Sequence, residues 1–411
     1  MIEIEKFVLD NGLKVVVHRD ASTPLAAVNI LYDVGAKDEE PDHTGFAHLI
    51  EHLMFEGSLN VPCYDEPLEK VGGTNNAFTN NDITNYYISL PAKNLETAFW
   101  LESDRMLGLD ITEKSLDIQR KVVSEEFRQR YLNQPYGDAW LYLLPMAYKK
   151  HPYQWPTIGK EISHIENASL QNVQAFFNRH YSPSNAILTV AGDVMADDVH
   201  KLCGKWFADI PNRTRNKRTL PEEPVQKEKR ELEIIREVPA DEIYMVWHGS
   251  ERKDENYYIQ DLITDILSQG KSSRLYSNLI KTKRLFSTID AYQTGSIDPG
   301  LIIISGRLSK GVSFKDAEQA ITEDVEALIK GTITDEELNK VKNKAESYLA
   351  LSYMNVLNKA MDLAYHELLW DAGRINEELQ HYRDVHAEDI RSVASAVFNE
   401  SNLSLMRYIA K

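Results

Sequence analysis

The feature that most constrains the fold of this chain is an internal repeat with an offset of about 215 residues. In the first half, an alternating strand, a polar loop and an amphipathic helix are predicted by LAAVNILYDVGAKDEEPDHTGFAHLIEHLMFEG; in the second half, the same order is predicted by ADEIYMVWHGSERKDENYYIQDLITDILSQG. Nearer the ends of the halves, a helix, a short turn and a strand are predicted by ENASLQNVQAFFNRHYSPSNAILTVAG and by VHAEDIRSVASAVFNESNLSLMRYIAK, about 220 residues apart. A similar offset at both places indicates that a whole domain was duplicated.

A polar segment separates the two halves. Residues 211–230 read PNRTRNKRTLPEEPVQKEKR, in which Leu220 and Val225 are the only aliphatic residues, and this composition is typical of a solvated linker. At 411 residues the chain is long enough for two domains of about 200 residues each. We therefore predict a first domain at 1–212, a linker at 213–230 and a second domain at 231–411.

Within each half, strand patterns and long helical patterns follow one another irregularly. Period-two alternation predicts strands at KVVVHRD, NILYDV, TNYYISL and AILTVAG, and helices are predicted over 93–107 and 112–132. The connections are hairpin-sized or long and helical, rather than regular strand–helix units, and this favours the α+β class. We expect two duplicated domains, each a mainly antiparallel sheet with helices packed on one face.

The composition excludes several classes of protein. Forty-six Lys and Arg against 63 Asp and Glu give a net charge of -17, so we expect no nucleic-acid partner and no anionic membrane. Cys63 and Cys203 are the only cysteines, too few for a disulfide framework or a cysteine zinc cluster. No apolar run approaches the roughly 18 to 20 residues that span a bilayer. The start, MIEIEKFVLDNGLKVVVHRD, lacks the features of a signal peptide, so we expect a cytoplasmic protein unless a signal sequence was removed ahead of it.

The segment GFAHLIEHLMFEGS, which begins at Gly45, places two histidines and a glutamate within five residues. Apolar spacing predicts a helix over 46–55, on which His48, Glu51 and His52 stand at i, i+3 and i+4 and share one face. Two imidazoles one turn apart can bind one zinc ion, and five residues alone leave open the alternative of ordinary helix histidines. Burying two histidines and a carboxylate without a partner is costly, which favours the metal.

A zinc site that performs hydrolysis needs a third protein ligand and one open position. The segment SLDIQRKVVSEEFRQRYLNQPYGDAW supplies Glu125 and Glu126 on a predicted amphipathic helix. If Ile118, Val122 and Val123 mark the buried stripe of this helix, Glu126 shares their face and Glu125 points toward solvent. Periodicity therefore favours Glu126 as the ligand, although paired glutamates on a helix are more often a solvated surface feature.

Together these motifs resemble the pitrilysin and insulin-degrading enzyme family of zinc peptidases, which includes mitochondrial processing peptidase and its bacterial relatives. The inverted motif HLIEH is followed some seventy residues later by QRKVVSEEFRQR. Three further segments stand in the order seen in that family: GGTNNAFTNNDITNYYISL, HPYQWPTIG and SQGKSSRLYSNLI. The resemblance covers most of the chain, at the length of the short two-domain members.

The resemblance implies specific roles for the site residues. It implies that His48, His52 and Glu126 bind one Zn²⁺ per chain. It implies that Glu51 is the general base, which acts on a water activated by the metal and passes the proton to the leaving amine. Many relatives carry a further glutamate seven residues before the ligand glutamate, and Gln119 stands in that place here. An amide can orient the site by hydrogen bonds but supplies no charge.

The resemblance also implies a place for the substrate and for a partner. Asn76, Ala77 and Phe78 would lie on a sheet edge to which a substrate peptide adds as a further strand. The second half has no histidine pair, because DLITDILSQG carries only Asp261 and Asp265, so we expect it to be non-catalytic. In the family, half-chains of this size pair around an enclosed chamber, which implies a homodimer or a heterodimer with a related chain.

Two functions of different classes are consistent with these features. The first is a zinc endopeptidase that hydrolyses short or unfolded peptides in an enclosed chamber. The alternative is a non-catalytic scaffold or partner subunit of a peptidase complex. The intact set of two histidines and two glutamates favours the enzyme, because degenerate subunits typically lose one or more of them. A metal-dependent hydrolase of other substrates would leave the peptide-like edge strand unexplained.

Overall fold

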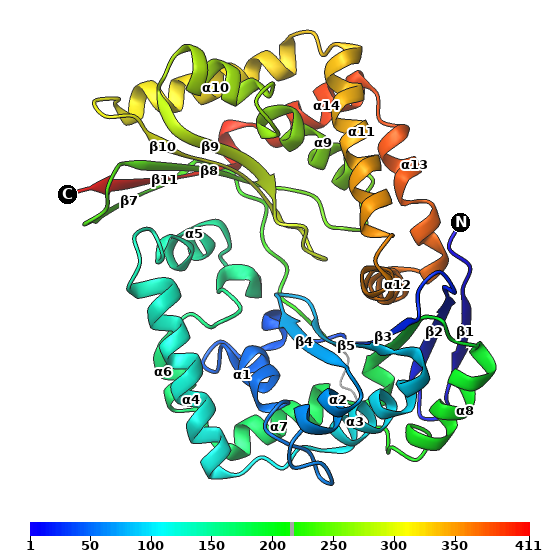
Figure 1. Cartoon of the computed structure of the whole chain (residues 1–411). Helices are drawn as coiled ribbons and strands as arrows, with labels where there is room; N and C mark the ends of the chain where they lie inside the picture. Colours follow the sequence, from blue (N-terminus) through cyan, green and yellow to red (C-terminus); the bar gives the residue numbers. More distant parts are fainter. Residues whose placement is uncertain (214–217) are drawn as a thin grey trace. The chain divides into compact units, whose positions relative to one another are not determined.

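The computed structural model of the chain describes residues 1–213 and 218–411, which form two compact units of helix and sheet (Figure 1). The first unit consists of Met1–Gln129, Trp155–Pro221 and Ala350–Glu377, and the second of Arg130–Gln154, Glu222–Leu349 and Glu378–Lys411. Part of the predicted linker at 213–230, residues 214–217, lies outside the described residues. The predicted α+β class is confirmed, with one sheet in each unit, but helices pack on both faces of each sheet and not on one face as predicted.

The first unit is built on a six-stranded sheet with the order β1-β2-β6-β3-β5-β4. Its strands are β1 (Glu5–Val8), β2 (Lys14–Arg19), β3 (Leu25–Tyr32), β4 (Thr74–Thr79), β5 (Thr84–Pro91) and β6 (Ala186–Gly192). All neighbouring strands are antiparallel except β2 and β6, which run parallel with Lys14 opposite Ile187. The four segments that period-two alternation predicts as strands form β2, β3, β5 and β6.

Helices cover both faces of this first sheet (Figure 1). They are α1 (Phe46–Leu53), α2 (Asp65–Lys70), α3 (Leu95–Leu107), α4 (Glu113–Phe127), α6 (Ile162–Glu166), α7 (Leu170–His180), α8 (Ala196–Trp206) and α12 (Val356–Leu369). Ala27 of β3 and Ala191 of β6 pack against Val356 and Ala360 of α12. Because successive side chains of a strand alternate between faces, the buried Ala26 beside Ala27 points to the opposite face. Thus α12 comes to this sheet from the second half of the sequence.

The second unit repeats this topology with five strands in the order β7-β11-β8-β10-β9. They are β7 (Arg230–Arg236), β8 (Glu242–His248), β9 (Phe286–Gln293), β10 (Leu301–Leu308) and β11 (Leu403–Ala410). The order matches β2-β6-β3-β5-β4 of the first sheet, and the one parallel pair, β7 with β11, stands where β2 pairs with β6. This shared arrangement confirms the duplication that the sequence predicts.

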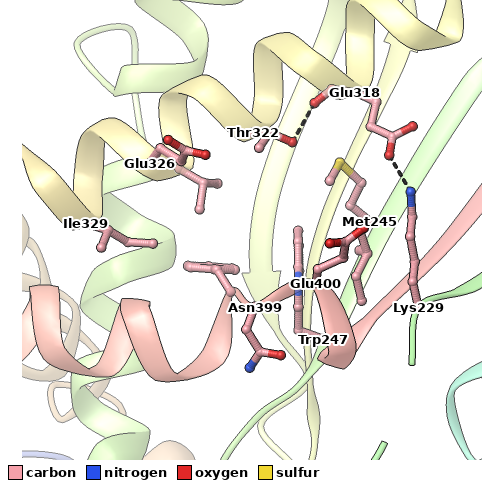
Figure 2. A pocket seen from close by; sticks show the side chains of 12 residues that line it. Lys229, Met245, Trp247, Glu318, Thr322, Glu326, Ile329, Asn399 and Glu400 are labelled. Atoms are coloured by element: carbon pink, nitrogen blue, oxygen red, sulfur yellow. Dashed lines mark hydrogen bonds and ion pairs between the residues drawn. The ribbon is translucent and has the colours of Figure 1, made fainter. Parts of the chain in front are cut away.

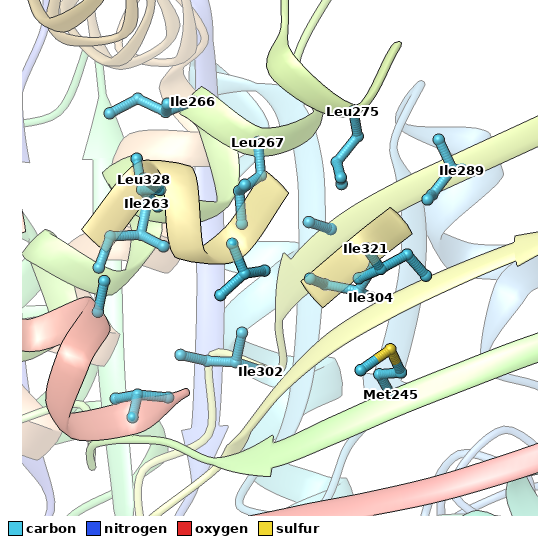
Figure 3. Close-up of a cluster of buried hydrophobic side chains, with 14 of the residues drawn as sticks. Met245, Ile263, Ile266, Leu267, Leu275, Ile289, Ile302, Ile304, Ile321 and Leu328 are labelled. Atoms are coloured by element: carbon cyan, nitrogen blue, oxygen red, sulfur yellow. The ribbon is translucent and has the colours of Figure 1, made fainter. Parts of the chain in front are cut away.

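The second sheet also buries both faces. Its helices are α5 (Ala139–Ala147), α9 (Asn256–Ser268), α10 (Phe314–Lys330), α11 (Asp335–Ser352), α13 (Glu378–Arg383) and α14 (Ala387–Val397). On β8, Ile243, Met245 and Trp247 join a core with α9, α10 and α14, part of which Figure 3 shows, whereas Tyr244 and Val246 pack with α5. In the part of the chain that the structure describes, no helix combines the length and apolar character needed to cross a bilayer.

Each unit therefore takes a helical segment from the other half of the sequence. The helix α5 belongs to the first half but packs on the second sheet, and α12 belongs to the second half but packs on the first. The two helices begin about 217 residues apart, close to the offset of the repeat, so the exchange is reciprocal. The predicted domain boundaries did not foresee this exchange, because α5 lies inside 1–212 and α12 lies inside 231–411.

One prediction about α4 is wrong. Of the three residues predicted to mark its buried stripe, Val123 is buried, but the exposed fractions of Ile118 and Val122 are 42% and 45%. The residues that α4 buries include Leu116, Val123 and Phe127, spaced seven and four apart. Ile118 and Val122, one turn apart, form a second apolar strip on another side of the helix. Apolar spacing shows that both strips exist but does not show which one is covered.

Candidate metal centre

The helix α1 carries the two histidines and Glu51, and its start is held by a tight turn. Gly45 precedes it with a φ of 87°, a conformation that favours glycine, and a side chain there would meet the carbonyl oxygen of Ile158. The N–H groups of Gly45 and Ala47 donate to the buried Glu39 carboxylate, at 2.8 and 2.9 Å. A carboxylate at a helix N-terminus is electrostatically favourable. The buried residues of α1 are Phe46, Ala47, Leu49, Ile50 and Leu53, which leaves His48, Glu51 and His52 on the other side.

Three possible metal ligands meet between α1 and α4, which are neighbours in Figure 1. The Oε2 atom of Glu126 lies 3.7 Å from Nε2 of His48 and 3.6 Å from Nε2 of His52. One ligand atom from each residue lies within 4.8 Å of the other two. Tetrahedral zinc with bonds of about 2.0 to 2.1 Å separates its ligand atoms by roughly 3.4 Å, so this donor set fits zinc after small side-chain shifts. Within residues 1–213 and 218–411, no other group of three His, Cys, Asp or Glu side chains has this geometry.

The two neighbouring glutamates of α4 lie in different surroundings. Glu126, three residues after the buried Val123, is half-buried and lies beside both imidazoles. Glu125 is exposed; its carboxylate accepts from Gln129 at 3.3 Å and lies 3.7 Å from Arg128. The structure therefore brings Glu126, and not Glu125, to the histidines. Glu126 was predicted as the ligand because it shares a helix face with the predicted stripe. Although residues 118 and 122 of that stripe are exposed, the buried Val123 lies on the same side of α4 as Glu126, so Glu126 still faces the histidines.

The Glu51 carboxylate is held by Thr79, for which the sequence predicted no role. The Oγ1 atom of Thr79, the last residue of β4, donates to Oε2 of Glu51 at 2.5 Å. Burial raises the pKa of Glu51 and the charge of Glu126 adds to this rise, whereas the Thr79 hydrogen bond and His52 oppose it. The sequence could have suggested Thr79 as a site residue. In the strand TNNAFT it stands two residues after Ala77, so both side chains lie on the same face.

The second nitrogen of His52 begins a chain of polar contacts. Its Nδ1 lies 3.1 Å from Oε1 of Gln119, and Nε2 of Gln119 donates to Oε1 of Glu56. Burial tends to lower the pKa of His52, but the hydrogen bond and charge of Glu126 raise it above its ordinary value, with help from Glu51 and Gln119. The sequence predicted a role for Gln119 but none for Glu56, although Glu56 stands four residues after His52.

Asn76, Ala77 and Phe78 lie on β4, which is the last strand in the order of the first sheet and so forms its edge. The backbone N–H of Ala77 donates to the side-chain Oδ1 of Asn76, at 2.9 Å. Phe78 is 38% exposed. Because Thr79 continues the same strand and binds Glu51, the edge strand ends beside the carboxylate of α1.

A cavity of about 390 Å³ belongs to the second unit (Figure 2). It is lined by Lys229, Met245, Trp247, Glu318, Thr322, Val325, Glu326, Ile329, Phe398, Asn399, Glu400 and Leu403. This lining contains no histidine and no cysteine, and Glu318 is paired with Lys229 at 2.7 Å. The described residues of this lining form no group of three possible metal ligands.

The helix α9, which corresponds to α1 in the second unit, carries two aspartates and no histidine. Asp265 is paired with Lys344 at 2.7 Å, and Asp261 accepts from the hydroxyl of Tyr382 at 2.8 Å. Both carboxylates thus join α9 to neighbouring helices of its own unit. The duplicated unit uses these positions for packing contacts.

Two models of one family match the chain in succession. Residues 14–160 match the model described as insulinase, peptidase family M16, and residues 167–345 match the model of the M16 inactive domain. The chain belongs to the M16 family of peptidases. The insulinase segment contains all the side chains of the candidate site, and the inactive-domain segment of this M16 chain contains α9.

Named relatives of this M16 chain are similar over almost its whole length. The zinc protease PqqE of Helicobacter pylori is 29% identical over 405 residues, which cover 97% of this chain and 90% of PqqE. The zinc protease YmxG of Bacillus subtilis is 23% identical over 400 residues, covering 97% and 96%. The crystal structure of a protease from Helicobacter pylori superposes with a TM-score of 0.92 at 28% identity, over 99% of this chain and all of that one.

Proposed function

We propose that this M16 chain is a zinc-dependent endopeptidase that hydrolyses short or unfolded peptides. The observation that carries the proposal is the meeting of His48, His52 and Glu126, with Glu51 on the same face of α1. These three side chains would hold one Zn²⁺ per chain. The relatives PqqE and YmxG are named zinc proteases, which supports both the metal and the reaction class.

The chain's own residues have separate tasks in the proposed reaction. When bound, zinc supplies Lewis-acid activation of a water and of a peptide carbonyl. With only three protein ligands, the site would leave room for a water at the metal, as catalytic zinc sites require. Glu51 accepts the proton of the attacking water and delivers it to the leaving nitrogen. The hydrogen bond from Thr79 to Oε2 holds the Glu51 carboxylate in place for this transfer.

We propose that the β4 edge binds the substrate through Asn76, Ala77 and Phe78. A peptide that adds to this edge is held by main-chain hydrogen bonds, which depend little on its sequence. Only an extended segment with free backbone groups can add in this way, and this requirement selects short or unfolded peptides. The exposed ring of Phe78 offers apolar surface to a substrate side chain.

We further propose that the working form is a dimer, of two copies or of this chain with a related one, that encloses a chamber. M16 members often pair with related chains, which supports this part of the proposal. Enclosure would also protect the β4 edge from pairing with other proteins. Native mass measurement alongside peptide cleavage tests it, and full activity from a monomer would contradict it.

Three variants test the proposed chemistry. Glu51→Gln should keep zinc and lose turnover by about 10²- to 10⁴-fold, since it removes proton transfer alone. Glu126→Gln should lose zinc and activity together. Glu125→Gln is the matched control on α4, and it should change neither. Zinc content and cleavage of a mixed peptide pool are measured for each protein.

Two results would decide against the enzyme. Peptide hydrolysis by Glu51→Gln at the rate of the unmodified protein would refute the role of Glu51 as the base. A purified chain that takes up no zinc when the metal is supplied would favour the alternative, a non-catalytic scaffold or partner subunit of a peptidase complex.

A further inference from the structure

We infer that Glu56 acts through Gln119 as the carboxylate that orients His52, so that two residues do together what a single glutamate at position 119 would do alone. This inference rests on the proposed zinc site. Both residues are positioning residues, because neither is placed to contact the substrate or the metal.

The three side chains are connected in series. Nε2 of His52 points toward Glu126, and Nδ1 lies 3.1 Å from Oε1 of Gln119. Nε2 of Gln119 then donates to Oε1 of Glu56, which lies in the turn after α1. The series joins α1 to α4 beside the ligand group. His52 and Gln119 are both partly buried, so water competes only in part for these bonds.

Glu56 determines the direction of every hydrogen bond in this series. A carboxylate oxygen accepts the hydrogen bond, so the amide nitrogen of Gln119 faces Glu56. The amide oxygen then faces His52, and because it also only accepts, Nδ1 of His52 must carry the proton. Nε2 of His52 is thereby left with its lone pair directed at the ligand group, as a metal ligand requires.

Without the Glu56 carboxylate, the amide of Gln119 has no fixed orientation. A flipped amide presents its N–H₂ group to Nδ1, and this group would stabilise the tautomer whose proton is on Nε2. That tautomer cannot bind the metal through Nε2. Outer hydrogen-bond partners of this kind typically contribute about 10- to 100-fold to metal affinity. We therefore expect the effect of Glu56 to be visible in zinc binding itself, apart from catalysis.

The test is zinc affinity, measured by competition with a chromophoric chelator on the full chain. Glu56→Gln should weaken zinc binding by about 10- to 100-fold, and Gln119→Ala by a similar factor. The double variant Gln119→Ala with Glu56→Gln should be no weaker than either single variant, because both act through one series. Gln119→Glu combined with Glu56→Gln should restore affinity to within about threefold, since the carboxylate then contacts His52 directly. Glu125→Gln, also on α4, is the matched control and should leave the affinity unchanged.

The outcomes separate this inference from the proposed function. If the unmodified chain binds no zinc, the proposed function fails. If it binds zinc and Glu56→Gln binds equally well, only the role of Glu56 is refuted. Losses that add fully in the double variant, or no recovery in Gln119→Glu with Glu56→Gln, would also refute the series. Thermal unfolding of each metal-free variant shows whether a loss of affinity is a loss of fold.

Discussion

The hydroxyl of Thr79 is the group that holds the proposed base, and removing it tests that role directly. Thr79→Val replaces the hydroxyl by a methyl group of similar size. Valine is at least as favourable as threonine in a strand, so β4 should keep its pairing with β5, in which Thr79 stands opposite Thr84. The change therefore removes the 2.5 Å contact to Oε2 of Glu51 together with a longer contact, 3.4 Å, to Oγ1 of Thr84.

The expected loss follows from the kind of hydrogen bond that is removed. A hydrogen bond to a charged group contributes about 1.5 to 3 kcal/mol. If that contribution serves to hold Glu51 for proton transfer, its loss raises the activation free energy by the same amount. At about 1.36 kcal/mol for each tenfold change, kcat should fall roughly 10- to 150-fold. KM should change little, because the backbone of the edge strand is intact.

The assay is kcat and KM for an internally quenched peptide, with zinc content measured on the same samples. Thr79→Ser keeps a hydroxyl at the same place and is the matched control, expected to retain activity within about threefold. A Thr79→Val protein with full zinc content and unchanged kcat would refute the positioning of Glu51 by Thr79.

Further predictions concern the metal and the packing of the first unit. Removing zinc with a chelator should abolish peptide hydrolysis and one equivalent of zinc should restore it; activity that survives chelation would contradict the mechanism. The hydrogen bond from Lys359 of α12 lowers the pKa of Asp20, so the pair should stabilise the fold above pH about 4 and lose this effect as the pH falls below it. In urea unfolding from pH 7 to pH 3, Asp20→Asn should cost about 1.5 to 3 kcal/mol at neutral pH and show a shallower acid dependence; an unchanged pH dependence would count against the pair. Arg105 and Glu102 form an ion pair at 2.5 Å with only 1% of either side chain exposed, so Arg105→Leu should cost about 3 to 5 kcal/mol in unfolding free energy by leaving a buried carboxylate unpaired; a loss under about 1 kcal/mol would be inconsistent with that burial.

Local sequence was enough to predict the half of the site that lies on α1. The backbone geometry of an α-helix places residues i, i+3 and i+4 on one side whatever packs around it, so HLIEH alone predicts that His48, Glu51 and His52 share a face. The same holds for the strands, whose alternation appears in the sequence itself. Two halves with the same order of elements likewise predicted two sheets of one topology, as β2-β6-β3-β5-β4 and β7-β11-β8-β10-β9 show.

Contacts between distant segments required the tertiary structure. Thr79 reaches Glu51 only because β4 ends beside α1, and Glu56 joins His52 only through Gln119 on α4. The sequence predicted one buried stripe on α4 with Ile118, Val122 and Val123, but packing covered Val123 and left Ile118 and Val122 exposed. Helical spacing of apolar residues shows that a helix has a face that can be buried. Which face is buried depends on the elements that pack against the helix.

The exchange of α5 and α12 shows the same limit at the scale of whole helices. Each has an apolar face that a local pattern can predict, yet each packs on the sheet formed mainly by the other half of the sequence. The free energy of burying apolar surface depends on the area removed from water and has no direction, so it does not record which part of the chain supplies the partner. Sequence therefore predicted which surfaces are buried here, and the three-dimensional arrangement of the chain decided what covers them.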